Sequence, residues 1–235
     1  MIFTSIRMII ASVMYLRKKP VILLCIAVAL SVVASYMAYV AVQPVREDLY
    51  FSYTHIPAAL ICFLAFFVSL VASIMYLWKR KRGYDRAAEV STILGLVYGA
   101  VALISGAIWA NAAWGAYWNW DPKQATMLIL CIAYMGYLSL KLSIGGVEKR
   151  ALVGAVYNIL AFSTIPLTFL SVTLWGSLHP KASEVTMSLP VKQTLSLNLI
   201  AALLFFVYLL ITAFAVWSLE DRVNRLTYEK GEGGD

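Results

Sequence analysis

Long apolar stretches alternate with short polar segments along the 235 residues of the chain. A helix needs about 20 largely apolar residues to cross the hydrocarbon layer of a membrane. The stretches that meet this requirement lie at residues 21–42, 57–78, 90–111, 124–143, 151–175 and 195–218. The pattern therefore predicts an all-α polytopic membrane protein with six transmembrane helices. Because these helices use most of the chain, residues 1–235 are expected to form a single transmembrane domain.

The composition agrees with this prediction and leaves one segment to be explained. Hydrophobic residues make up 62% of the chain and charged residues 13%, more apolar surface than a soluble core can bury.

The first twenty residues are apolar but contain Arg7, and they end in a basic cluster that is followed by Pro20. A signal anchor begins in a similar way, but the segment is short for a span and has no small-residue cleavage site. We expect residues 1–20 to form an amphipathic helix on the inner membrane surface.

Lysine and arginine are concentrated in alternate loops. The rich segments are residues 17–19, residues 79–86, Lys149 and Arg150, and the tail at residues 219–235. Basic residues accumulate on the cytoplasmic side of membrane proteins. Both termini are therefore predicted to be cytoplasmic, with three loops outside. The net charge of +7 follows from this topology and gives no reason to expect a nucleic-acid partner.

The only two histidines, His55 and His179, both fall in predicted outer loops beside the ends of apolar stretches. A lone histidine at a membrane interface is usually a solvated polar residue. Two histidines on the same face are a less common coincidence, because the outer loops make up a small part of the chain. Neutral imidazole is a common metal ligand, and paired histidines are a standard way to hold haem iron. The pair favours a haem site with His55 and His179 as axial ligands.

The second outer loop, at residues 112–123, is rich in aromatic side chains. Trp114, Tyr117, Trp118 and Trp120 lie close together there, shortly after Trp109. Aromatic belts at membrane interfaces are the simplest explanation for such residues. A belt, however, usually contributes one or two rings at each helix end. The density of rings in this loop favours a platform for a flat ligand such as a porphyrin.

The end of this loop combines a helix-start signal with a cation. Asp121, Pro122 and Gln124 are typical of the first turn of a helix, which predicts Asp121 as the N-cap of the fourth span. Lys123 is one of few cations in the outer loops. A haem propionate and a lipid phosphate both suit it as a partner, and the sequence does not separate the two.

Three features inside the spans carry structural predictions. Gly95 and Gly99 predict close helix packing, Pro166 predicts a kink in the fifth span, and Lys141 is expected to extend its ammonium group towards the inner surface. No Asp, Glu or His falls near the middle of a predicted span. This absence argues against a proton-coupled transporter or an ion pump.

The absence of two kinds of motif argues against further classes of protein. The three cysteines, Cys25, Cys62 and Cys131, all lie inside apolar stretches and are expected to be free and to pack as small apolar residues. The chain has no C-x-x-C motif for thiol redox chemistry or covalent haem attachment. It also has no phosphate-binding loop, so any ATP hydrolysis would require a partner. These absences argue against a thiol oxidoreductase and an ATPase, and the question of other enzyme classes stays open.

The motif Trp114-Gly-x-x-Trp118-x-Trp120-Asp121 resembles the tryptophan-rich signature of the haem-handling proteins of cytochrome c maturation. Within this group the chain resembles the C proteins, the haem exporter protein C family. The segments Tyr53-x-His55-Ile-Pro57 and Ser171-Val-x-x-Trp175-x-x-Leu-His179 are similar as well. The stretch from Trp109 to Trp114 also resembles the haem synthase branch, whose members carry additional histidines inside their spans.

The resemblance implies a set of site residues. His55 and His179 would be the axial ligands of one non-covalent haem b with ferric iron. The expected platform residues are Trp114, Tyr117, Trp118, Trp120 and Asp121. Lys123 stands where relatives often have an arginine that meets the haem propionates. Lysine lacks the bidentate geometry of arginine, so this contact is expected to be looser.

The resemblance also implies a function. The protein would bind haem at the periplasmic face of the bacterial inner membrane and present it to a membrane-anchored haem chaperone during c-type cytochrome biogenesis. An ABC-type ATPase and permease and a small single-span protein would be its partners, together with membrane lipids. Two alternatives belong to other classes: a bis-histidine cytochrome for electron transfer, and a structural or transport subunit without haem. The first has no histidine left for a second haem, and the second would be colourless when purified.

Overall fold

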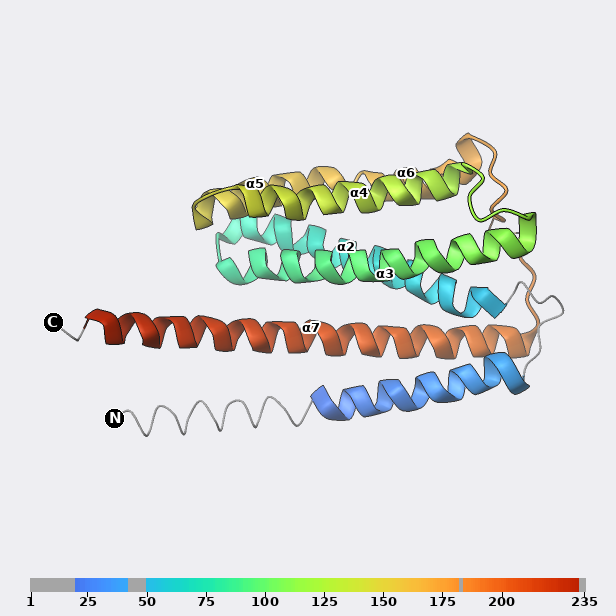
Figure 1. Ribbon diagram of the computed structural model, residues 1–235, viewed down its shortest axis with the longest axis horizontal. Coiled ribbons are helices and arrows are strands. Elements are labelled where there is room, and N and C mark those ends of the chain that lie inside the picture. The colour runs from blue at the N-terminus through green and yellow to red at the C-terminus, as the bar shows by residue number, and fades with distance from the viewer. Residues whose placement is uncertain (1–19, 42–49, 182–183, 233–235) are drawn as a thin grey trace.

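The computed structural model describes residues 20–41, 50–181 and 184–232 (Figure 1). In this part of the chain all regular elements are helical, and six segments are long and apolar enough to cross a membrane. They are Pro20–Ala41, Ser52–Lys79 (α2), Arg82–Trp114 (α3), Pro122–Ser143 (α4), Val147–Leu174 (α5 and α6) and Leu189–Asp221, which belongs to α7 (Leu189–Glu232). The prediction of a six-span, all-α membrane protein is confirmed. The expected interfacial helix lies outside the described residues, except for Pro20.

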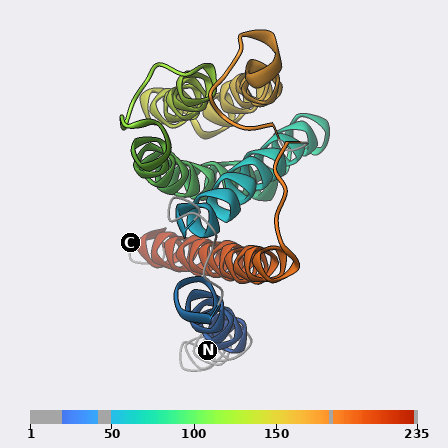
Figure 2. The same ribbon diagram turned by 90° about the vertical axis from the view of Figure 1, so that its right-hand side faces the viewer.

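The helices are arranged in layers around a central pair, α2 and α3 (Figure 2). Helices α4, α5 and α6 lie on one side of this pair, and α7 lies on the other. The first span ends in a π-helical turn, η1 (Met37–Ala41), and packs on the outer side of α7. Because α7 and the first span are the least buried of the six, the main core lies among α2 to α6, and a smaller cluster joins α2 to Phe206 of α7.

The two ends of the bundle differ in what they carry (Figure 1). The turn between α2 and α3 and the C-terminal end of α7 lie at one end. The loop between α3 and α4 and the segment between α6 and α7 lie at the other. This arrangement brings the beginning of α2, the end of α3, the beginning of α4 and the end of α6 together.

Small residues allow the core helices to approach closely. A carbon at the Cβ position of Gly95 would lie 2.6 Å from the ring of Phe66. That ring stacks on Tyr134 of α4, with centroids 3.6 Å apart and planes inclined by 9°. The predicted close packing at Gly95 and Gly99 is therefore confirmed, and the contacts extend through α2, α3 and α4.

The fifth span is broken into α5 (Val147–Ala161) and α6 (Thr164–Leu174). Pro166 explains the break, since it has no N–H for the carbonyl of Phe162 and its ring crowds that carbonyl. Shorter-range hydrogen bonds replace the helical pattern, with Ser163 N donating to Leu160 O (3.1 Å) and Ile165 N to Phe162 O (3.0 Å). The predicted kink is confirmed.

Two local predictions are wrong. Lys141 does not extend to the surface, because its ammonium group is bound inside the bundle by Asp85 at 2.7 Å and Glu89 at 3.1 Å, both on α3. Its side chain is only 5% exposed. Helix α2 begins at Ser52 rather than at Pro57, so His55 lies within the first turn of the helix instead of preceding it.

The helices also extend further than the apolar stretches. Helix α3 continues to Trp114, which shortens the aromatic loop to residues 115–121. Helix α7 continues through the expected tail as far as Glu232. The apolar stretch of a sequence corresponds to the part of the helix inside the hydrocarbon layer. Backbone hydrogen bonds allow the helix to continue beyond that layer.

Candidate functional site

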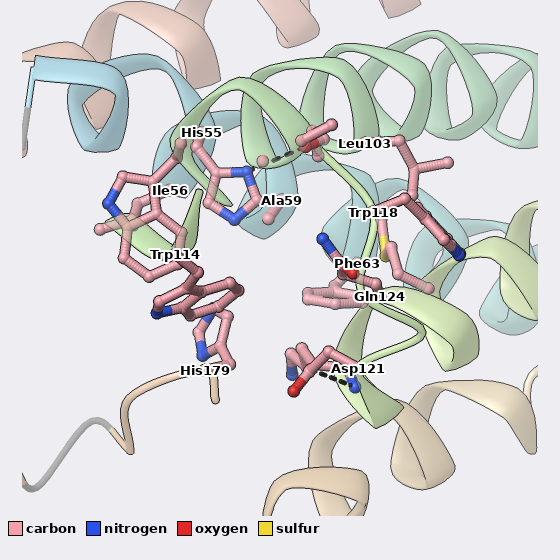
Figure 3. A pocket seen from close by; sticks show the side chains of 16 residues that line it. His55, Ile56, Ala59, Phe63, Leu103, Trp114, Trp118, Asp121, Gln124 and His179 are labelled. Atoms are coloured by element: carbon pink, nitrogen blue, oxygen red, sulfur yellow. Dashed lines mark hydrogen bonds between the residues drawn. The ribbon is translucent and has the colours of Figure 1, made fainter. Parts of the chain in front are cut away.

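A cavity of about 190 Å³ lies at the end of the bundle where α2 and α4 begin and α3 ends (Figure 3). Most of its wall is apolar, and it is lined by parts of α2, α3 and α4, the loop between α3 and α4, and the loop after α6. The predicted site residues in its lining are His55, Trp114, Trp118, Asp121, Lys123 and His179. The structure thus brings together residues from segments that are distant in the sequence.

The two histidines face each other across part of this cavity. His55 lies in the first turn of α2 and His179 in the loop after α6. The centroids of their rings are 6.5 Å apart, and the ring planes are inclined by 49°. Two imidazoles on opposite sides of one metal, at a metal–nitrogen distance of about 2 Å, would place their centroids roughly 6 Å apart. The separation suits a single metal centre between the rings.

Hydrogen bonds fix the same tautomer on both rings. Nδ1 of His55 donates to the carbonyl oxygen of Ala102 at 2.9 Å, and Nδ1 of His179 donates to that of Pro180 at 3.0 Å. A carbonyl oxygen only accepts, so the proton lies on Nδ1 and leaves the lone pair of Nε2 free. Metal-binding histidines typically donate their other ring N–H in this way. Both imidazoles are therefore prepared to act as ligands through Nε2.

The position of His55 depends on a glycine of α3. A carbon at the Cβ position of Gly106 would lie 2.8 Å from Cε1 and 3.0 Å from Nδ1 of His55. Only a glycine at this position lets the ring lie against α3 and reach the carbonyl of Ala102. Gly106 was not among the predicted site residues.

The position of His179 depends on Asp121. The Asp121 side chain is buried and caps α4 by accepting the Lys123 backbone N–H at 2.9 Å, which confirms the predicted N-cap. The same carboxylate accepts the Ser177 hydroxyl at 2.7 Å and the Leu178 N–H at 2.6 Å. Ser177 Oγ in turn accepts the His179 N–H at 3.0 Å. Asp121 therefore connects the loop that carries His179 to the beginning of α4.

Burial lowers the pKa of the His179 imidazole below its ordinary value. The hydrogen bond to Pro180 and the negative charge of Asp121 oppose this shift, and the positive charge of Lys123 adds to it. The His179 ring is therefore neutral at pH 7. A neutral ring is the form that binds a metal.

Lys123 lies at the wall of the cavity and is held in place by α6. Its Nζ donates to the carbonyl oxygen of Thr168 at 2.9 Å and lies 4.8 Å from the centre of the Phe169 ring. An ammonium group has three N–H donors. The bond to Thr168 uses one of them, which leaves donors for an anionic group in the cavity.

The aromatic residues of the loop divide into two groups. Trp114 and Trp118 line the cavity together with Trp109, whose ring lies 4.8 Å from that of Trp114. Trp120 and Tyr117 are 76% and 60% exposed and lie outside the lining. Trp120 has a positive φ of 55°, which turns the chain just before α4 begins.

Three further lining residues were not among the predicted site residues. Trp109 could have been included, because it belongs to the aromatic cluster that the sequence shows, and its ring lies 5.9 Å from that of His179. Phe63 and Met127 come from the interior of the spans α2 and α4. Nothing distinguishes them in the sequence from the other apolar residues of those spans.

The donor set decides which kind of metal centre fits. Among the described residues, no group of three His, Cys, Asp or Glu side chains is arranged to hold a metal ion. A bare zinc ion takes three or four protein ligands. A pair of imidazoles suits a metal that brings its remaining ligands with it, as the iron of a porphyrin does.

Comparison with known proteins identifies the family. The sequence profile described as "Heme exporter protein C" matches residues 5–230 of the chain. The chain belongs to the haem exporter protein C family. The match extends over all six spans and includes both histidines and the tryptophan-rich loop.

Individual relatives agree with this assignment. The chain is 35% identical over 116 residues to Heme exporter protein C of Rhodobacter capsulatus, which is 46% of this chain and 48% of the relative. It is 30% identical over 135 residues to the protein of the same name in Bradyrhizobium diazoefficiens, covering 57% and 51%. It is also 40% identical over 92 residues to Cytochrome c biogenesis protein CcsA of a Synechococcus strain, covering 39% and 29%. The matches thus span about half the length, or less, of these relatives.

Proposed function

We propose that this protein binds haem b non-covalently between His55 and His179 and presents it to a haem chaperone during c-type cytochrome biogenesis. One observation carries the proposal: two imidazoles with centroids 6.5 Å apart each donate Nδ1–H to a backbone carbonyl. The names of relatives supply the cargo, since they refer to haem export and cytochrome c biogenesis. Iron that is delivered in the ferric state suits two neutral imidazoles as axial ligands.

The remaining lining supports a porphyrin as the ligand. Trp114 and Trp118 offer flat apolar surfaces that border a macrocycle and exclude water from it. Lys123 has free ammonium donors at the same wall, and a haem propionate is an anion of suitable kind. Asp121 contributes by holding the His179 loop, because its carboxylate is already engaged by Lys123, Ser177 and Leu178.

The size of the cavity supports presentation rather than storage. Its volume of about 190 Å³ is below the roughly 300–1,000 Å³ of pockets that enclose ligands of drug size. A porphyrin held by the two histidines would therefore keep part of its edge outside the wall. Trp120, the sequence neighbour of the cavity-lining Asp121, is 76% exposed. We propose that a membrane-anchored chaperone meets the haem there.

The charge distribution supports a periplasmic site. Lys79, Arg80, Lys81 and Arg82 lie at the turn between α2 and α3, at the end of the bundle away from the cavity. Basic loops of membrane proteins remain in the cytoplasm. The cavity would then open at the periplasmic face of a bacterial inner membrane. An ABC-type ATPase, a permease and a small single-span protein are the partners we propose for ATP-dependent steps.

Electron transfer across the membrane is the second candidate, and the sequence disfavours it. A b-type cytochrome that moves electrons through the bilayer usually carries a second haem near the other face. The chain has two histidines in all, and both lie at one cavity. A second bis-histidine haem has no ligands here.

The function can be tested in cells that lack their own haem exporter protein C. We expect the wild-type chain to restore covalent haem in c-type cytochromes, measured by haem staining of separated membrane proteins. Trp118→Ala should reduce this restoration, because Trp118 lines the cavity. Trp78→Ala is the matched control, since Trp78 is 76% exposed at the other end of α2. Equal restoration by both variants, or none by the wild-type chain, would contradict the proposal.

A further inference from the structure

Three sulfur-containing side chains converge on Gly99, below the cavity. A carbon at the Cβ position of Gly99 would lie 3.0 Å from Cys131 Sγ, 3.2 Å from Cys62 Sγ and 3.9 Å from Met127 Cε. Because both sulfur atoms lie so close to one point, they can be no more than 6.2 Å apart, the sum of the two distances. Three helices, α2, α3 and α4, meet there.

The two thiols are inside the bundle and not on its lipid-facing surface. Cys62 is 0% and Cys131 is 5% exposed, and both are free. Buried cysteine often packs simply as a small apolar residue. Here, however, two thiols and the methyl end of the Met127 thioether approach the same point from two helices, and the missing side chain of Gly99 leaves no Cβ atom between the two Sγ atoms.

We propose that Cys62, Cys131 and Met127 form a binding site for Cu(I). Thiolate and thioether sulfur are soft ligands that select Cu(I) over harder ions. In this step one Cu(I) ion forms bonds to the two Sγ atoms, and the two thiol protons are released to solvent. The Met127 thioether donates a lone pair without losing a proton. No electron is transferred, so neither an oxidant nor a reductant is consumed.

The site is connected to the haem cavity but chemically distinct from it. Met127 lines the cavity and also approaches the Gly99 position. Methionine has three rotatable bonds and adapts its shape easily, so its movement offers a way from the cavity to the thiols. The haem cavity provides imidazole nitrogen as a ligand, and the site near Gly99 provides sulfur. A soft metal ion therefore has a binding place of its own beneath the proposed haem.

The test is a Cu(I) titration of the full-length protein in detergent under reducing conditions, in competition with the chromophoric chelator bicinchoninate. We expect one Cu(I) ion per chain to be withdrawn from the chelator. Losing a supporting contact around a metal site costs about 10–100-fold in affinity, and losing a ligand should cost at least as much. Cys62→Ser and Cys131→Ser should therefore each weaken binding by at least that factor, with a smaller loss for Met127→Leu.

Two controls separate this site from others. Cys25 is exposed on the first span, so Cys25→Ser should leave Cu(I) binding unchanged. A protein with both His55→Ala and His179→Ala should also keep its Cu(I) affinity, while Cys62→Ser should keep its haem. Failure of haem binding and failure of copper binding are then distinguishable results. Cu(I) binding that disappears only in the histidine variant would overturn the proposal.

A second measurement needs no variant and covers the case that a cysteine substitution prevents folding. X-ray absorption at the copper edge of the wild-type complex reports the atoms bound to copper. Sulfur neighbours alone are expected. Nitrogen neighbours, or no retention of Cu(I) against bicinchoninate, would show that the three sulfur atoms do not form a metal site.

Discussion

The imidazole rings of His55 and His179 lie with their centroids 6.5 Å apart, although the two residues belong to opposite halves of the sequence. Different interactions fix the position of each ring. His55 lies against Gly106 and donates to Ala102, whereas His179 follows a loop that Asp121 connects to α4. These interactions make the site sensitive to residues that do not face a ligand.

Gly106→Ala should weaken haem binding without removing a ligand. The added methyl group would lie 2.8 Å from Cε1 of His55, so the ring must move and its bond to Ala102 is lost. Loss of such a supporting contact typically costs about 10–100-fold in metal affinity. Titration of the purified protein with haem, followed by absorption, measures the change.

Gly83 provides the matched control, since a Cβ atom there meets nothing within 4 Å. Gly83→Ala should leave haem affinity unchanged and favour α3 slightly, because alanine is the better helix former. An equal loss of haem in the two variants would show that the contact with His55 is not the cause.

Asp121→Ala should affect both stability and haem binding. The variant loses the helix cap, which is worth about 0.5–2 kcal/mol, and it releases Ser177 and Leu178 from the carboxylate. His179 is then free to move away from His55. Thermal unfolding in detergent and haem titration check the two effects. Glu184→Ala is the control, since the Glu184 carboxylate makes exposed contacts with Lys181, an ion pair and a hydrogen bond from the Lys181 N–H. Comparable haem loss in this variant would contradict the role of Asp121.

Haem retention should persist when the pH falls to about 6.5, the ordinary pKa of histidine, and should be lost only at lower pH. The reason is that burial lowers the pKa of His179 in the folded protein, and a proton competes with iron for the free nitrogen. The unfolded chain takes up this proton first, so the free energy of unfolding also decreases as the pH falls below that value. Absorption spectra recorded over a pH series test this expectation. Release of haem with a midpoint above pH 7 would be inconsistent with a buried neutral His179.

Lys141→Ala should destabilise the bundle far from the haem site. Removing the ammonium group leaves Asp85 and Glu89 without their shared cation. Loss of one partner of a fully buried pair costs about 3–5 kcal/mol, and a smaller loss is expected here because the carboxylates are partly exposed. Thermal unfolding in detergent measures the change. Lys149→Ala, at an exposed position, should have little effect, and equal melting temperatures for the two variants would contradict the account.

The sequence predicts the architecture well because a membrane span is a property of local composition. The six spans, the kink at Pro166, the cap at Asp121 and the close packing at Gly99 all follow from short segments. The sequence does not show how each helix is rotated about its axis or which side chain it meets. The contacts of Lys141 with Asp85 and of His55 with Gly106 depend on that rotation. Neighbouring residues in the sequence do not determine the rotation.

The central claim is tested most directly by absorption spectra of the purified protein after addition of ferric haem. Wild type, His55→Ala and His179→Ala are compared in the oxidised and reduced states. The account predicts a low-spin spectrum for the wild type, and loss of haem or conversion to a high-spin spectrum in each variant. If both single variants keep the haem content and the low-spin spectrum of the wild type, His55 and His179 are not the axial ligands.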